Sequence, residues 1–105
     1  MRDHFIATLS EKAALDKKIM RITGDLGFGV LNDYEKRFPD QYFNAGVAEQ
    51  NMMGVAAGLA LVGKIPFAAS FAIFNPGRNW EQLRNSVAYS ELNVKVVGGH
   101  AGLCT

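Results

Sequence analysis

The sequence has few of the residues that mark secreted, fibrous or nucleic-acid-binding proteins. It contains one cysteine, Cys104, in 105 residues, which excludes an internal disulfide and makes the cytoplasm the expected compartment. The 11 Lys and Arg residues nearly balance the 10 Asp and Glu residues, for a net charge of +1. Because they form no cluster, neither nucleic acid nor a membrane surface is an expected partner.

Long apolar runs and a leader sequence are also missing. The longest mostly apolar stretch, residues 47–74, is interrupted by Glu49, Lys64 and Pro66, whereas a membrane span needs roughly 20 unbroken apolar residues. The N-terminal residues lack the apolar run and small-residue cleavage site of a signal peptide. The 49% of hydrophobic and 20% of charged residues that are present are typical of one soluble globular domain.

Helical and extended patterns alternate along the chain. Residues 2–16 place an apolar stripe between charged residues, which predicts an amphipathic helix. A β-prone run at 19–23 ends at Gly24, and the glycines that follow predict a loop. The other expected elements are a short helix at 32–38, an extended segment at 41–44, a helix at 48–61 buried on several sides, and strands at 65–74 and 93–97.

One more helix is expected between the last two strands. Asn75 and Pro76 have the pattern of an N-cap and a first helical residue, and Trp80, Leu83 and Val87 would face inward. Strands separated by helices predict an α/β fold with a mostly parallel sheet flanked by helices. Ligands of such sheets bind at the carboxyl ends of the strands, so the candidate site consists of the loops after Thr23, Asn44 and Val97 and the segment around residues 70–74.

Glu49 opens the predicted helix at 48–61 and has two interpretations. In the first, it lies in solvent and complements the positive end of the helix dipole, a contribution of roughly 0.3 to 1 kcal/mol. In the second, Val47, Met52 and Met53 enclose its carboxyl group, which then serves as a proton donor near neutral pH. Spacing alone favours the solvated interpretation.

Four other side chains in these loops are candidates, each with a structural alternative. Phe71 and Phe74 fill the core or, if the chain bends there, form an aromatic wall for a planar heterocycle. Asp25 caps a turn or touches a ligand, and His100 is a loop residue or an acid–base group. No metal site is expected, because the histidines and the cysteine form no ligand cluster.

The segments 43–52, 54–61, 64–67 and 70–74 closely resemble the pyrimidine-binding domain of transketolases, especially split or short forms whose C-terminal half is a separate subunit. The turn at 24–26 and the segments 37–40, 80–85 and 100–102 follow in the family's order, so the resemblance covers nearly the whole chain. It implies one partial pyrimidine-binding domain over residues 1–105, with the thiamine diphosphate-binding fold.

The resemblance also implies thiamine diphosphate as cofactor and gives each candidate a role. Glu49 would hydrogen-bond the ring nitrogen of the aminopyrimidine and favour its imino tautomer. Phe71 and Phe74 would enclose the pyrimidine, with Asp25 near the thiazolium. Arg2 would bind the phosphate of a sugar phosphate substrate, and His100 would touch the substrate's hydroxyl groups, so that Glu49 and His100 are the expected catalytic residues.

Departures from the family pattern are equally informative. A family serine falls at Gly29 and a family tyrosine at Gly77. The motif for diphosphate and Mg²⁺ is missing, which implies that a diphosphate-binding partner subunit, equivalent to the N-terminal half, holds the metal. Because the family continues beyond His100-Ala101-Gly102, we expect Thr105 to end a truncated chain that is inactive alone, with exposed apolar surface, an unpaired strand edge and a tendency to associate.

The resemblance therefore predicts part of a transferase that moves a two-carbon ketol unit between sugar phosphates, as in the pentose phosphate pathway, within a homo- or hetero-oligomer. Two enzyme alternatives use the same cofactor: 1-deoxyxylulose-5-phosphate synthase and the β subunit of a 2-oxo acid dehydrogenase. Arg2 and His100 favour ketol transfer. The non-enzymatic alternative is a truncated interaction module.

Overall fold

The computed structural model describes residues 1–103, and Cys104 and Thr105 lie outside the described residues. Its four strands form one sheet in the order β2-β1-β3-β4, and every neighbouring pair is parallel. The strands are β1 (Ile19–Thr23), β2 (Tyr42–Asn44), β3 (Ile65–Phe71) and β4 (Lys95–Gly99). The predicted α/β class with a parallel sheet is confirmed.

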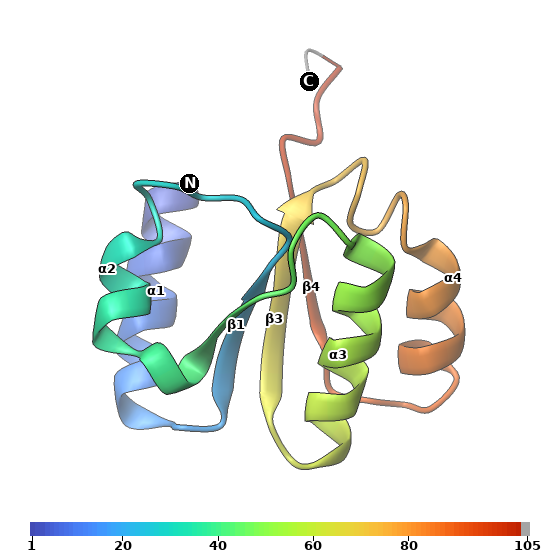
Figure 1. Ribbon diagram of the computed structural model, residues 1–105, viewed down its shortest axis with the longest axis horizontal. Coiled ribbons are helices and arrows are strands. Elements are labelled where there is room, and N and C mark those ends of the chain that lie inside the picture. The colour runs from blue at the N-terminus through green and yellow to red at the C-terminus, as the bar shows by residue number, and fades with distance from the viewer. Residues whose placement is uncertain (104–105) are drawn as a thin grey trace.

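Helices cover both faces of the sheet, as Figure 1 shows. α1 (Arg2–Leu15) and α2 (Asn32–Arg37) lie on one face, and the 3₁₀ turn η1 (Pro39–Gln41) joins α2 to β2. α3 (Glu49–Leu61) and the short α4 (Trp80–Gln82), which continues as the π-helix η2 (Leu83–Ala88), lie on the other. Because all four strands point the same way, the loops that follow them meet at one edge.

The core forms on both sides of β1, whose five residues are all buried. Ile19 packs with Leu9 of α1 and Tyr34 of α2. On the opposite face, Ile22 packs with Met52 of α3 and with other apolar side chains. Burial on both faces is why this strand reads as a continuous β-prone run rather than an alternating one.

Gln41 ties three segments together from the end of η1. Its buried side-chain amide donates hydrogen bonds to the carbonyl oxygens of Ala13, Asp16 and Ile19, at 3.1, 3.1 and 3.0 Å. The Tyr34 hydroxyl donates to the Gln41 carbonyl oxygen at 3.3 Å. These bonds join the end of α1 and the start of β1 to the entrance of β2.

The segment after β3 differs from the sequence prediction. The strand ends at Phe71 rather than at residue 74, and the Asn75–Pro76 bond is cis and lies in a loop, so Asn75 is not a helix N-cap. The helix begins at Trp80, which is 63% exposed rather than directed inward. Leu83 and Val87 do pack inward against the α3 side of the core.

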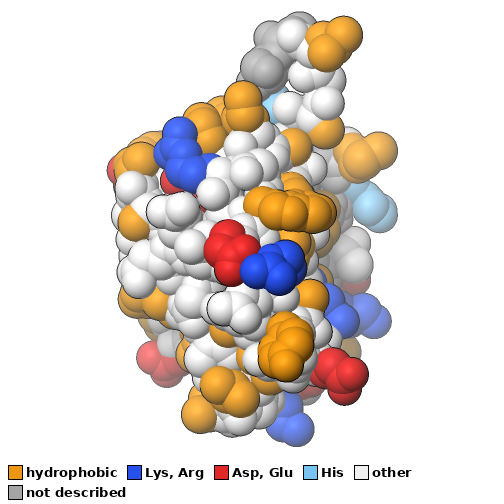
Figure 2. Space-filling view, turned by 90° about the vertical axis from the view of Figure 1, so that its right-hand side faces the viewer, with side chains coloured by type: hydrophobic (Ala, Val, Ile, Leu, Met, Phe, Trp, Pro, Cys, Tyr) orange, Lys and Arg blue, Asp and Glu red, His pale blue; other side chains and the backbone are white. Residues whose placement is uncertain are grey.

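The face that carries α4 and η2 is drawn in Figure 2, where hydrophobic side chains flank an acidic and a basic side chain in contact. Trp80 and Tyr89 are exposed on this segment, and Glu81 pairs with Arg84 at 2.9 Å. Exposed apolar side chains therefore occur on this face, and their attribution to a truncated chain stays a prediction.

Two smaller predictions need correction. The final strand runs over residues 95–99 instead of 93–97, because Lys95 and Gly99 pair in register with Phe67 and Phe71. α3 is buried along one stripe rather than on several sides, since Gln50, Asn51, Gly54 and Gly58 are exposed. Over residues 1–103, no helix has the length and apolar character required to cross a membrane.

Candidate functional site

The candidate site lies at the carboxyl edge of the sheet, where the loops after β1, β2 and β3 meet the start of α3. The backbone there is closely packed around Glu49. A Cβ atom added to Gly24 would lie 3.3 Å from the Gly46 carbonyl oxygen and 3.8 Å from Cγ of Glu49. Glycine therefore lets the loops after β1 and β2 approach the first residue of α3.

Glu49 is buried, so the solvated interpretation favoured by spacing is wrong. Its side chain is 4% exposed, and Nη1 of Arg78 donates a hydrogen bond to Oε2 at 3.0 Å. The Asn79 side-chain amide donates to the Glu49 backbone carbonyl oxygen at 3.1 Å. The loop before α4 thus fixes both the side chain and the backbone of Glu49.

The two phenylalanines lie together, because the chain turns directly after β3. The rings of Phe71 and Phe74 are stacked, with centroids 6.2 Å apart and planes 22° apart. The centroid of the His100 ring lies 4.5 Å from the centroid of the Phe71 ring. The bend that an aromatic wall requires is therefore present.

Arg78 joins the aromatic pair to the carboxylate. Its Cζ atom lies 4.5 Å from the centroid of the Phe74 ring, while Nη1 binds Glu49. Sequence reasoning missed this residue, because a single arginine in a loop carries no periodic or motif signal. Its contacts depend on the turn after Phe71, which brings residues 29 positions apart together.

Asp25 binds Asn44, the last residue of β2, rather than Glu49. Its backbone N–H donates to Oδ1 of Asn44 at 2.9 Å, and Nδ2 of Asn44 donates to its Oδ1 at 3.1 Å. Asp25 and His100 both have positive φ, of 61° and 53°. This conformation is uncommon for residues other than glycine and concentrates at functional sites.

Arg2 is not joined to this group. It lies exposed at the start of α1, and its Nε binds the carboxylate of the adjacent Asp3 at 3.0 Å. The structure therefore brings together Glu49, Phe71, Phe74 and His100, places Asp25 on the flanking loop, and leaves Arg2 apart.

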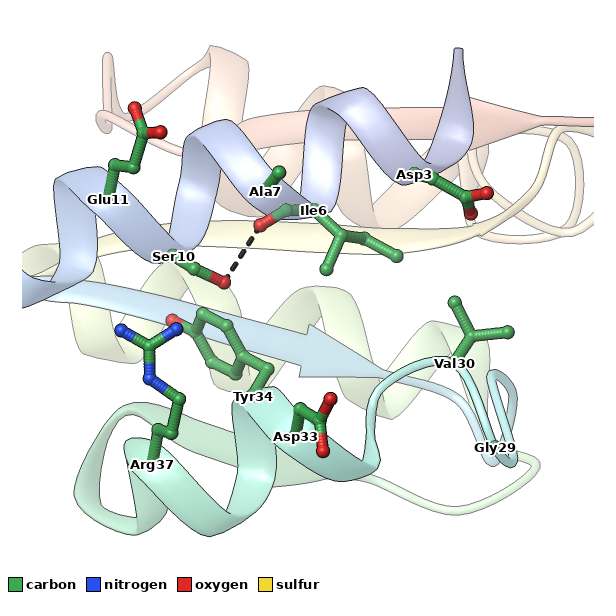
Figure 3. Close-up of a pocket in the computed structure, with 10 residues that line it drawn as sticks. All are labelled: Asp3, Ile6, Ala7, Ser10, Glu11, Gly29, Val30, Asp33, Tyr34 and Arg37. Carbon is green, nitrogen blue, oxygen red and sulfur yellow. Dashed lines mark hydrogen bonds between the residues drawn. The ribbon is translucent and has the colours of Figure 1, made fainter.

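A separate hollow lies between α1 and α2, and Figure 3 shows the side chains around it. It is an open groove of about 580 Å³ lined by Asp3 of α1 and by Asp33 and Arg37 of α2. It lies on the face of the sheet opposite to α3. Within residues 1–103, no three His, Cys, Asp or Glu side chains are grouped to hold a metal ion.

The structure shows the surroundings of Gly29 and Gly77, the two positions where the family has a serine and a tyrosine. A Cβ atom at Gly77 would collide with the Ile73 carbonyl oxygen, so this loop has no room for the family's tyrosine. Gly29 has φ of +78°, a conformation that favours glycine, and nothing lies within 4 Å of its added Cβ.

Comparisons with known proteins give the family of the chain. The profile of the family "Transketolase, pyrimidine binding domain" matches residues 1–105. A protein of Methanocaldococcus jannaschii, provisionally named as a transketolase C-terminal section, is 50% identical over 104 residues, which are 98% of this chain and 33% of that protein. A 6-deoxy-6-sulfo-D-fructose transketolase subunit of a Clostridium species is 42% identical over 104 residues, or 98% of this chain and 32% of that subunit.

A less similar enzyme and a solved structure also match the chain. A 1-deoxy-D-xylulose-5-phosphate synthase of Rhodobacter capsulatus is 38% identical over 96 residues, which are 90% of this chain and 15% of that enzyme. A solved split-gene transketolase, described as an inactive β4 tetramer, superposes with a TM-score of 0.83 at 47% identity, covering 91% of this chain and 32% of its own. The chain spans about a third of the length of the first two transketolase relatives.

Proposed function

Because the chain belongs to the pyrimidine-binding domain family of transketolases, we propose that it binds and activates the aminopyrimidine of thiamine diphosphate. A partner subunit that binds the diphosphate and Mg²⁺ would complete the site. The assembled enzyme would transfer a two-carbon ketol unit between sugar phosphates. The observation that carries this proposal is a buried glutamate, Glu49, joined through Arg78 to a pair of stacked aromatic rings at the carboxyl edge of a parallel sheet.

The residues present fit an aminopyrimidine. This group is flat and carries two ring nitrogens and an amino group, and Glu49 would bind one of the ring nitrogens. Phe71 and Phe74 offer aromatic surface for stacking. Glu49 offers a carboxyl group shielded from water, where an interaction with a ring nitrogen is stronger than in solvent. When bound, the cofactor supplies the carbon nucleophile and the electron sink for ketol transfer.

Each residue of this chain would have a limited task. Glu49 would exchange a proton with the pyrimidine ring nitrogen, Phe71 and Phe74 would hold the ring, and Asp25 would lie near the thiazolium. His100, exposed beside Phe71, would contact substrate hydroxyl groups. Arg2 would bind substrate phosphate from the N-terminus of α1, although its only side-chain ion pair within residues 1–103 is with Asp3.

A partner subunit is part of the proposal for two reasons. The sequence has no motif for diphosphate and Mg²⁺, and no metal-ligand group occurs in residues 1–103. The solved relative described as an inactive tetramer of β subunits supports the expectation that this chain alone has no activity.

A substitution of Glu49 tests the function in the reconstituted complex. Glu49→Gln keeps the size of the side chain but removes the exchangeable carboxyl proton, so we expect ketol transfer to fall by roughly 10²- to 10⁴-fold. The measurements are the transfer rate between sugar phosphates and calorimetric binding of thiamine diphosphate with Mg²⁺.

The matched control is Glu81→Gln, because Glu81 is an exposed glutamate on α4. Its turnover should stay within about twofold of wild type, as for most surface substitutions. Turnover that is unchanged in Glu49→Gln would remove Glu49 from the mechanism and favour the non-catalytic interaction module.

The similarity to 1-deoxy-D-xylulose-5-phosphate synthases supports a second candidate reaction. In that reaction pyruvate would replace the ketose donor. Substrate profiling of the same complex separates the two, since formation of deoxyxylulose phosphate from pyruvate would exclude ketol transfer as the main activity. A 2-oxo acid dehydrogenase reaction would instead consume a 2-oxo acid without a sugar phosphate acceptor.

A further inference from the structure

Arg78 holds only one of the two carboxylate oxygens of Glu49. The bond from Nη1 reaches Oε2, and the other oxygen, Oε1, has no hydrogen-bond donor among residues 1–103. The carboxylate thus has one oxygen fixed by the protein and one available to a ligand. This division suits a group that must be oriented before it exchanges a proton.

The guanidinium is itself fixed on a second side. It lies over the Phe74 ring at 4.5 Å, an arrangement in which a planar cation is attracted by the π face. Arg78 therefore connects the aromatic wall to the carboxylate, because the same guanidinium contacts both Phe74 and Glu49. A lysine would supply the charge without the planar stacking.

Arg78 also places a positive charge against the carboxylate of Glu49. When Glu49 gives its proton to a ring nitrogen, the O–H bond breaks, an N–H bond forms, and the negative charge stays on Glu49. A cation 3.0 Å away stabilises that product.

We propose that Arg78 is a positioning residue for the aminopyrimidine: it fixes Oε2 of Glu49, leaves Oε1 to the ring nitrogen, and stabilises the carboxylate formed when the proton is transferred. This inference rests on the proposed function. Arg78 does not touch the reacting atoms, so it acts through Glu49. Its side chain is 51% exposed, so solvent weakens the interaction and the expected effect is moderate.

The test uses the reconstituted complex and two readouts other than turnover. Deuterium exchange at C2 of the thiazolium, followed by quenched-flow NMR, reports activation of the cofactor. Calorimetry with thiamine diphosphate and Mg²⁺ reports binding. In Arg78→Met we expect exchange to slow by about tenfold, equivalent to about 1.4 kcal/mol, while the dissociation constant changes by less than about threefold.

The matched control is Arg84→Met, which removes another exposed arginine paired with a glutamate on the adjacent helix. It should leave exchange unchanged. In Arg78→Ala, free guanidinium at concentrations that do not unfold the complex should restore part of the lost exchange rate. A purely structural role for Arg78 predicts no such rescue.

Wild-type exchange in Arg78→Met, an equal loss in Arg84→Met, or no rescue in Arg78→Ala would each overturn the positioning role. These results are distinct from failure of the proposed function. If wild-type complex neither binds thiamine diphosphate nor accelerates C2 exchange, the cofactor assignment itself is wrong and the role of Arg78 fails with it.

Discussion

Among single residues, Arg21 is buried in the middle of β1 without an acidic partner in the described chain. It is 8% exposed, and within residues 1–103 its Nε and Nη1 atoms have no hydrogen-bond partner. The ring of Phe5 lies 5.6 Å from its Cζ atom and offsets part of the cost. Burial lowers the pKa of the Arg21 guanidinium to about 10. Because the folded state holds this proton less tightly than the unfolded state, Arg21 destabilises the fold.

We therefore expect Arg21→Met to stabilise the chain. Methionine fills a similar volume and needs no hydrogen bonds, so the free energy of unfolding should rise by about 1 to 2 kcal/mol at pH 7. The gain should be complete below pH 10 and shrink as pH rises above it, because the wild-type guanidinium then loses its charge in the folded state first. Urea unfolding at several pH values measures this difference.

Arg37→Met is the control, because Arg37 is exposed and also lies over an aromatic ring, 5.0 Å from the centroid of Phe38. It should change stability by less than about 0.5 kcal/mol. A lower free energy of unfolding in Arg21→Met would show that the charge has a favourable partner and would contradict the prediction.

Residue identities were predicted more reliably than residue environments. The family order selected Glu49, Phe71 and Phe74, which the structure brings together around one edge of the sheet. The burial of Glu49 could not be read from spacing, because it arises from Arg78 and Asn79, which follow it by about 30 positions. The predicted inward direction of Trp80 is wrong for a different reason: its helix begins later than the sequence indicates.

At the scale of elements, periodic segments were predictable and the segment after β3 was not. α1, β1 and α3 each follow a local pattern of apolar residues, and their predicted bounds lie within one residue of those observed. The loop at 72–79 instead depends on the side chain of Asn75. Its amide donates to the carbonyl oxygens of Ala68 at 2.9 Å and Val97 at 3.2 Å. Such bonds to neighbouring strands override the local resemblance to a helix N-cap.

We expect Asn75→Ala to destabilise the chain by about 2 to 4 kcal/mol, because it leaves a cavity and removes buried hydrogen bonds. Asn75 is fully buried, and its Oδ1 accepts a hydrogen bond from Asn79, which also binds the backbone of Glu49. Removal of the Asn75 side chain should therefore also disturb the hydrogen bond from Asn79 to Glu49 at the candidate site. Urea unfolding gives the stability, and Asn85→Ala, at an exposed asparagine of η2, is the control.

Equal stabilities of Asn75→Ala and Asn85→Ala would show that the buried amide does not hold the loop to the strands. The prediction also covers cofactor binding at the candidate site. In the reconstituted complex, Asn75→Ala should bind thiamine diphosphate more weakly than Asn85→Ala does.

For the whole molecule, exposed apolar side chains mark the edge that carries the candidate site. Phe28, Val47 and Ile73 follow β1, β2 and β3, and their exposed fractions are 79%, 73% and 63%. Because the strands are parallel, all three loops lie at the carboxyl edge, near Glu49 (Figure 1). An exposed apolar side chain on each of these three loops suits a protein–protein interface, and Leu15, Leu61 and Val62 are similarly exposed at the opposite edge. This arrangement fits a cofactor site shared with a diphosphate-binding subunit.

The arrangement predicts unequal effects of two similar surface substitutions. Ile73 lies at the carboxyl edge, whereas Leu61, which is 70% exposed, lies at the opposite end of α3. Ile73→Ser should weaken binding of the partner subunit by about tenfold, in the range of a moderate interface residue. Leu61→Ser should leave it within about twofold. Calorimetric titration of the two subunits measures both constants, and circular dichroism confirms that each variant is folded. Equal affinities would mean that the partner binds another face, and that the site at the carboxyl edge is not completed there.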